Sequence, residues 1–382
     1  MNEQETLTHF LQVTADPYHA VAEKKKESGK KVIGCFPMYL PEELIHASGM
    51  SPVVLWAGNE PITVAHAHVP TFYCSIVRPF IDDWLKGRLD FLDGMIFYDT
   101  CLQVRALPFI FDKNKRPTYM EVIYHHAFLP EVVRKPHKTY LMENLENLRK
   151  TLENFSGRKI TDDLLRKSIQ IYNKNRELLR RLYELRRKKA GLLKAKDIMS
   201  IVQASMLMPK EEHNQLLERL LTELEQMPAP GDGKVRLMAV GGLCRTVPYE
   251  ILDLIERMGA NIIDDDLYVG SKYFINDADP KADPIEALAD RYFNRTPPCP
   301  TKGDWESNWG DYIIDRMRKN DADGAINFLV KYCAPHMAYY PDVKQKMTEA
   351  DIPELMIEIE HEQVPMGQLE TRLQAFLEVA RG

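Results

Sequence analysis

The chain has 382 residues, of which 45% are hydrophobic and 28% charged, a composition typical of globular proteins. The chain is longer than a typical domain with a single hydrophobic core, so its length predicts two or three domains. A net charge of −6 excludes a general electrostatic attraction to nucleic acid or to anionic membranes.

Two further features of the sequence bear on the cellular location of the protein. No apolar run approaches the length of a membrane span, and the N-terminus lacks a basic stretch followed by an apolar one. We therefore expect a cytoplasmic protein with no membrane or nucleic-acid partner. The six cysteines are widely spread, so we expect thiols or metal ligands rather than a disulfide framework.

Residues 1–139 alternate strand and helix patterns. Short apolar runs predict strands at 31–34, 51–56, 94–99 and 118–124. A helix is predicted at 41–47, because a proline opens the segment and Gly49 follows it. Strands separated by helices at this spacing indicate a parallel sheet covered on both faces, so we expect an N-terminal α/β domain over 1–139.

Residues 140–230 change character. Apolar residues recur every three or four positions in 141–155, 162–189 and 210–225, which predicts helices. The run Met-Pro-Ala-Pro-Gly-Asp-Gly at 227–233 is typical of a linker. We therefore expect a helical insert and linker over 140–230.

Residues 231–382 repeat the pattern of the first part. Strands are predicted at 235–240, 260–263 and 325–330, with a helix starting at Pro248. Residues 93–101 match 323–333, and 119–126 match 355–362. The expected fold is α/β, with two Rossmann-like parallel-sheet domains, 1–139 and 231–382, flanking the helical insert.

Four cysteines follow predicted strands, and a helix pattern comes after each: Cys35, Cys101, Cys244 and Cys333. Ligands and cofactors bind at the carboxyl ends of strands in open α/β sheets. Cysteines at that edge suit a soft metal or an iron–sulfur cluster. The alternative is that they are small hydrophobic residues of the core.

Nucleotide-binding and hydrolase motifs are missing from the sequence. It contains no Gly-x-x-x-x-Gly-Lys-Ser/Thr, no Gly-x-Gly-x-x-Gly after a strand and no Gly-x-Ser-x-Gly. We expect no ATP or dinucleotide to bind this chain itself. The acidic run 264–266 is typical of a turn and less often of a hard-cation site. The basic residues at 186–189 indicate a solvated helix end or, less often, a contact with a coenzyme phosphate or an acidic partner.

Several segments resemble the 2-hydroxyacyl-CoA dehydratase and ATP-dependent (class I) benzoyl-CoA reductase family. They are Gly-Cys-Phe-Pro-Met-Tyr-Leu-Pro-Glu-Glu-Leu-Ile-His-Ala-Ser-Gly-Met at 34–50, Glu-Glu-His-Asn-Gln at 211–215 and Gly-Gln-Leu-Glu-Thr-Arg-Leu-Gln-Ala-Phe at 367–376. The resemblance covers nearly the whole chain, and is strongest to the reductase C-type subunits.

The resemblance implies one [4Fe–4S] cluster held by three cysteines, which leaves one iron without a protein ligand. Matched motif by motif, the ligands are Cys74, Cys101 and Cys333. Cys35, Glu60 and Cys244 become candidate pocket residues. Cys299 is similar to a cysteine of related double-cubane cluster proteins.

The resemblance also implies a function. It indicates an iron–sulfur subunit of a ferredoxin-driven benzoyl-CoA reductase that passes single electrons to an aromatic CoA thioester. The implied partners are a homologous larger cluster and substrate subunit, ATPase activator subunits and ferredoxin. Alternatives are the small subunit of a 2-hydroxyacyl-CoA dehydratase, a non-catalytic electron relay, and a double-cubane cluster protein. We expect four aromatic residues near strand ends to line the site: Phe36, Trp56, Phe97 and Phe328.

Overall fold

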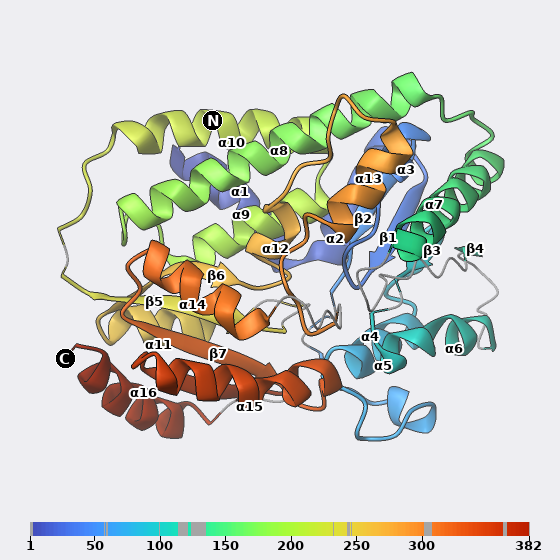
Figure 1. The fold of residues 1–382 in the computed structure, drawn as a ribbon. Coiled ribbons are helices and arrows are strands. Elements are labelled where there is room, and N and C mark those ends of the chain that lie inside the picture. Colours follow the sequence, from blue (N-terminus) through green and yellow to red (C-terminus); the bar gives the residue numbers. More distant parts are fainter. Residues whose placement is uncertain are drawn as a thin grey trace.

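The computed structural model describes residues 3–56, 58, 60–98, 100–113, 121–123, 135–231, 233–242, 245, 247–301, 308–361 and 365–381. In this part of the chain two four-stranded parallel sheets are surrounded by helices (Figure 1). The expected α/β class with two Rossmann-like parallel sheets is confirmed.

The two sheets share one topology. The first has the order β2-β1-β3-β4, with β1 (Val32–Phe36), β2 (Ser51–Val54), β3 (Gly94–Phe97) and β4 (Glu121–Ile123). The second has the order β6-β5-β7-β8, with β5 (Val235–Gly241), β6 (Ala260–Asp266), β7 (Gly324–Val330) and β8 (Glu354–Ile359). The repeat predicted from the sequence is thus a repeat of strand order. Because the strands of each sheet are parallel, their carboxyl ends meet at one edge.

Helices follow the strands in both halves. Those of the first half are α2 (Pro17–Ser28), α3 (Glu42–Ala47), α4 (Val77–Leu85), α5 (Leu102–Arg105) and α6 (Leu107–Lys113), with a 3₁₀ turn η1 at Ala65–Ala67. Those of the second half are α11 (Tyr249–Arg257), α12 (Ser271–Phe274), α13 (Pro284–Phe293), α14 (Trp309–Lys319), α15 (Ala334–Glu349) and α16 (Met366–Ala380).

The helical insert contains α7 (Lys135–Ser156), α8 (Asp162–Lys188), α9 (Ala195–Leu207) and α10 (Lys210–Gln226). Helices α8 and α10 of the insert lie across the top of the molecule in Figure 1, and α7 lies on its right side. Thr161 starts the long helix α8, since its side chain accepts the backbone N–H of Leu164. The N-terminal helix α1 (Glu3–Ala15) packs against α9 and α10, far along the chain. The three-part division of the chain stays a prediction.

The core follows from alternation along the buried strands. In β5, Leu237 and Ala239 belong to a large cluster that continues through both halves and the insert, whereas Met238 and Val240 belong to a second cluster under α14 and α15. Both faces of the second sheet are therefore covered, as expected for parallel strands.

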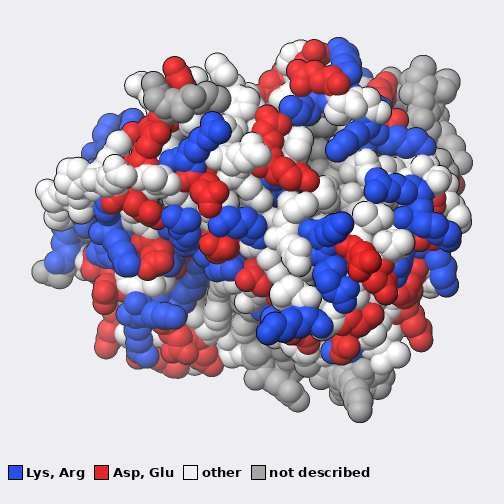
Figure 2. All heavy atoms as spheres, turned by 90° about the horizontal axis from the view of Figure 1, so that it is seen from above, with Lys and Arg blue, Asp and Glu red and all other residues white. Residues whose placement is uncertain are grey.

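Surface charge is mixed. On the face seen from above, basic and acidic side chains are interspersed and neither sign dominates (Figure 2). Among the helices that the structure describes, none is long and apolar enough to span a membrane.

Candidate metal centre

The three predicted cysteine ligands stand at the N-terminal ends of three helices. Cys101 is the N-cap residue of α5 and Cys333 that of α15, so the two occupy equivalent places after β3 and β7. Cys74 lies two residues before Ile76, the N-cap residue of α4. The positive end of a helix dipole favours a thiolate over a thiol, so each helix start suits a metal-binding sulfur.

Backbone amides at two of these helix starts point at the sulfurs. The N–H groups of Ile76 and Val77 donate to Cys74, and the N–H of His336 donates to Cys333. Burial nevertheless raises the pKa of Cys74 to about 11, with a further contribution from Cys101. The free thiol is therefore protonated at neutral pH, and metal binding there would release its proton.

The pKa of the Cys333 thiol is affected by the other two predicted ligands. Burial is the largest cause that raises the pKa of the Cys333 thiol, and charges on Cys74, Cys101 and Cys299 raise it further. Each of the three predicted ligands thus lies within electrostatic reach of the others, although Cys333 comes from the other half of the molecule.

Gln103, in α5, ties the cysteine segments together. Its Oε1 accepts the backbone N–H of Cys74 at 2.7 Å, and its Nε2 donates to the carbonyl of Tyr332, the residue before Cys333, at 3.2 Å. Nearby, Ser75 Oγ donates to the carbonyl of Ile359 at the end of β8, at 3.3 Å. These bonds hold the strand ends of the two halves against each other around the thiols.

The donor set fits a cluster better than a single ion. In the described ranges, no three His, Cys, Asp or Glu side chains lie close enough to hold one metal ion. In a [4Fe–4S] cluster each thiolate binds a different iron, so its ligands stand further apart. Three soft donors at separate helix starts would suit such a cluster and would leave one iron without a thiolate. The ligand assignment itself remains a prediction.

The sequence patterns did not identify His336, which contacts Cys333. His336 Nδ1 lies 3.4 Å from its sulfur, and the His336 ring is 1% exposed. Burial, and then the charge of Lys272, lowers the pKa of His336 to about 3, so its ring is neutral. The spacing Cys-x-x-His at a helix start was the available signal, because residues three apart share a helix face.

Cys299 lies on this side of the site as well. Its sulfur is 2.6 Å from Tyr268 Oη and 3.0 Å from Thr301 Oγ1, and its side chain is buried. The Cys299 thiol is therefore hydrogen-bonded to two hydroxyl groups.

The two candidate pocket residues that the structure describes, Cys35 and Glu60, have different surroundings. Cys35 is fully buried within β1, and its sulfur faces the carbonyl of Ile33 at 3.9 Å. The carboxylate of Glu60 is 61% exposed and pairs with Arg88 at 3.4 Å. The backbone carbonyl of Glu60, however, accepts His361 Nε2 from the second half at 2.6 Å. Cys244 lies outside the described residues.

A small recess lies between the segments that follow β1 and β6. Four tyrosines contribute to its lining: Tyr39, Tyr268, Tyr273 and Tyr292. Of the aromatic residues expected as walls, Phe36 instead stacks on Phe80 at 3.9 Å, and Phe97 packs edge-on against Phe111 at 5.1 Å. These phenylalanines are core residues because both sheet faces are covered.

Two of the residues that line this recess, Glu42 and Tyr273, contact the buried Lys210. Tyr273 Oη donates to Glu42 at 3.0 Å and accepts from Lys210 at 2.5 Å, while the Lys210 ammonium lies 3.6 Å from the Glu42 carboxylate. Burial raises the pKa of Glu42 and lowers that of Lys210. Glu42 can therefore hold a proton at a pH where an exposed glutamate would have lost it.

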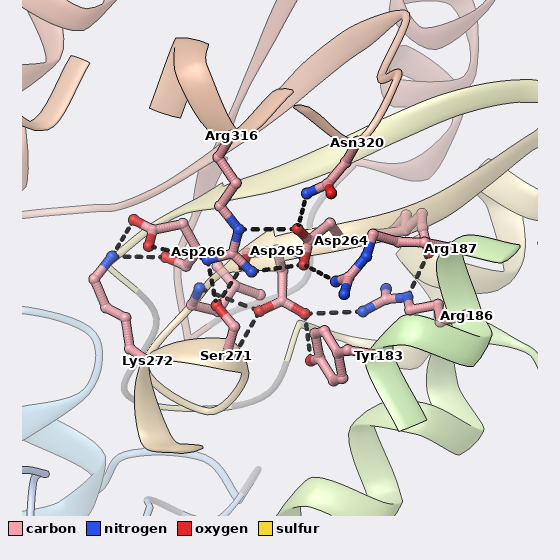
Figure 3. A network of polar contacts seen from close by, with 12 residues as sticks. Tyr183, Arg186, Arg187, Asp264, Asp265, Asp266, Ser271, Lys272, Arg316 and Asn320 are labelled. Carbon is pink, nitrogen blue, oxygen red and sulfur yellow. Dashed lines mark hydrogen bonds and ion pairs between the residues drawn. The ribbon is translucent and has the colours of Figure 1, made fainter. Parts of the chain in front are cut away.

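The acidic run at the end of β6 is an internal charge network (Figure 3). Asp264 binds Arg316 at 2.6 and 2.9 Å, and Asp265 binds Arg186 at 2.9 Å. Asp266 pairs with the buried Lys272. Because these cations neutralise the three carboxylates, the hard-cation interpretation is not supported. Arg186 likewise serves the interior and not a coenzyme phosphate.

Comparisons with known proteins agree with the architecture. The chain is 31% identical to the C-type subunit of benzoyl-CoA reductase from Thauera aromatica over 337 residues, covering 86% of each protein. It is 29% identical to the (R)-phenyllactyl-CoA dehydratase beta subunit of Clostridium sporogenes over 379 residues, covering 99% of each. The beta subunit of lactoyl-CoA dehydratase from Anaerotignum propionicum is 28% identical over 98% of both chains.

These relatives are subunits of enzymes. The family model for the 2-hydroxyglutaryl-CoA dehydratase D-component matches residues 37–380, which include the second sheet, the helical insert and every strand of the first sheet except β1. The chain therefore belongs to the 2-hydroxyglutaryl-CoA dehydratase D-component family.

Proposed function

We propose that this chain is the iron–sulfur subunit of an ATP-dependent, ferredoxin-driven reductase of the benzoyl-CoA reductase type, with a [4Fe–4S] cluster bound by Cys74, Cys101 and Cys333. The observation that supports the proposal is that these thiols, each at or near a helix start, lie within electrostatic reach of one another although they come from both halves. Such a cluster, when bound, accepts and passes on one electron at a time at low potential.

The chain's own residues have distinct tasks in this proposal. The three cysteines bind the cluster, and the amides of Ile76, Val77 and His336 stabilise negative charge on the sulfurs. Gln103 holds the segments of Cys74 and Tyr332 in register. Cys74 is buried, whereas Cys101 and Cys333 are partly exposed. Burial and hydrogen bonding of the ligand sulfurs together tune a cluster's potential.

The proposed complex has further members. A homologous larger subunit would hold a second cluster and the CoA thioester, and ATPase activator subunits would deliver electrons from ferredoxin. This division of labour suits a chain whose sequence carries no phosphate-binding loop. We place the complex in the cytoplasm of an organism that degrades aromatic compounds anaerobically. A reducing compartment suits the five free cysteines that the structure describes.

A second candidate is the beta subunit of a 2-hydroxyacyl-CoA dehydratase. The alignment with the (R)-phenyllactyl-CoA dehydratase beta subunit extends over 99% of both chains, against 86% for the reductase subunit. In that candidate the same electron would make a 2-hydroxyacyl thioester lose water, with no net oxidation or reduction of the substrate.

Substrate tests separate the two candidates. The chain is co-expressed anaerobically with its larger partner and supplied with the ATPase activator, ATP and a low-potential donor. Consumption of benzoyl-CoA with stoichiometric oxidation of the donor supports the reductase. Dehydration of 2-hydroxyacyl-CoA with only catalytic use of the donor refutes it and supports the dehydratase. An iron count far from about four per chain would refute the single-cluster assignment.

A further inference from the structure

His336 makes an unusual approach to a predicted cluster ligand. It is the third residue of α15, and its Nδ1 lies 3.4 Å from the sulfur of Cys333 while its own backbone N–H donates to the same sulfur. Cys333 therefore meets two nitrogen groups from one residue, one from the main chain and one from the ring.

The His336 ring cannot turn away from the sulfur without disturbing its neighbours. It packs edge-on against Tyr268, with ring centres 5.7 Å apart, and edge-on against Trp309, with ring centres 5.5 Å apart. The main chain at Gly242 closes another side, since a Cβ there would lie 2.4 Å from Nδ1. A side chain at residue 242 would thus occupy the place of the ring.

The neighbours of the ring are fixed in turn by the charge network of Figure 3. Trp309 Nε1 donates to Asp266 at 2.8 Å. The Lys272 ammonium lies over the Tyr268 ring at 5.3 Å and over the Trp309 ring at 5.6 Å. The acidic end of β6 therefore positions the two rings that clamp His336.

The chemistry of a bound thiolate decides which ring nitrogen carries the proton. A thiolate only accepts hydrogen bonds, so an unprotonated Nδ1 facing it would bring two lone pairs together. With the proton on Nδ1 the contact becomes a charge-assisted hydrogen bond. Within the described part of the chain, Nε2 has no hydrogen-bond partner, so nothing there holds the proton on the other nitrogen.

We infer that His336 is a positioning residue that donates an N–H···S hydrogen bond from Nδ1 to the Cys333 thiolate and so raises the reduction potential of the cluster. The inference rests on the proposed cluster. A hydrogen bond to a ligand sulfur stabilises the reduced state more, because reduction adds negative charge to the sulfurs.

The test compares midpoint potentials. The full chain is reconstituted anaerobically with iron and sulfide, and its cluster is titrated and followed by electron paramagnetic resonance. His336→Leu removes the donor, and His336→Asn keeps an N–H near the place of Nδ1. His213→Leu is the matched control, since His213 is also fully buried but bonds Asn175 and the carbonyl of Ile201 in the helical insert.

At the wild-type midpoint, we expect His336→Leu to lower the ratio of reduced to oxidised cluster about tenfold, which equals about 59 mV for one electron. His336→Asn should recover most of this, and His213→Leu should leave the ratio unchanged. A wild-type midpoint in His336→Leu overturns the inference, as does an equal shift in His336→Asn.

A second measurement covers the case in which His336→Leu fails to hold a cluster. Electron–nuclear double resonance on the reduced wild-type cluster, with ¹⁵N-labelled histidine, should show a coupled histidine nitrogen bearing an exchangeable proton. Lack of that coupling overturns the inference. A wild-type chain that binds no cluster refutes the proposed function instead, so the two failures are distinct.

Discussion

Replacing Lys272 with methionine is predicted to destabilise the chain strongly. The side chains of Lys272 and Asp266 are both 0% exposed and form an ion pair, and the Lys272 ammonium also donates to the Asp266 carbonyl at 3.0 Å. Methionine would keep much of the aliphatic stem but would leave the Asp266 carboxylate with Trp309 and with Arg316, whose nearest nitrogen is 4.0 Å away. Breaking a buried pair in this way costs about 3–5 kcal/mol.

Urea unfolding of the full chain under anaerobic, reducing conditions measures this loss as a lower midpoint at an unchanged slope. Lys188→Met is the matched control, because Lys188 pairs with Glu184 at 2.6 Å on the surface, with 70% and 55% of the two side chains exposed. That variant should lose less than about 1 kcal/mol. In the double variant Lys272→Met/Asp266→Leu part of the stability should return, because neither member of the ion pair is left buried without its partner. A loss below about 1 kcal/mol in Lys272→Met would refute the reasoning.

Three further predictions concern the candidate site and the first half. Serine in place of Cys74, Cys101 or Cys333 should abolish the visible absorption of the cluster, whereas Cys299→Ser should keep it. If one of the three ligand variants retains the absorption, that cysteine is not a ligand. The free energy of unfolding should fall less between about pH 4 and pH 2 in Asp82→Asn than in the wild type. Burial opposes ionisation of Asp82, but Lys86 and backbone amides outweigh it and lower its pKa to about 2, so its contribution is present above the unfolded pKa near 3.8 and lost below about 2. Urea midpoints at pH 5 and pH 2.5 that fall equally in variant and wild type would contradict this. Gly242→Ala should cost about 1–3 kcal/mol by overpacking against His336, and an unchanged urea midpoint would show that the ring moves freely.

Much of the architecture could be predicted from local pattern. The strands, the insert helices and the repeat follow from hydrophobic periodicity, and strand ends drew attention to Cys101 and Cys333. Cys74 precedes a helix and follows no strand, so periodicity alone could not select it, and only the resemblance did.

Other parts of the site depend on partners distant in the sequence. Considered alone, the acidic run at 264–266 indicated a turn and the basic end of α8 a solvated helix end, and each left an external ligand as the less frequent alternative. Their mutual neutralisation is visible only when α8 lies against β6. The packing of α1 on α9 and α10 and the burial of Phe36 against Phe80 have the same origin. Local sequence specifies which elements form, and tertiary packing decides which side chains meet.

The distribution of the three cysteines over the two halves has a mechanical consequence. Cys74 and Cys101 belong to the first half of the chain and Cys333 to the second. A cluster bound by all three would therefore be a covalent cross-link between the two halves. Loss of the cluster, for example to oxygen, would remove this cross-link and leave the shared hydrophobic core and polar contacts such as those of Gln103 and Ser75 to hold the two halves together. Oxidative damage at the metal would then also weaken the contact between the halves, which couples the state of the redox centre to the stability of the fold.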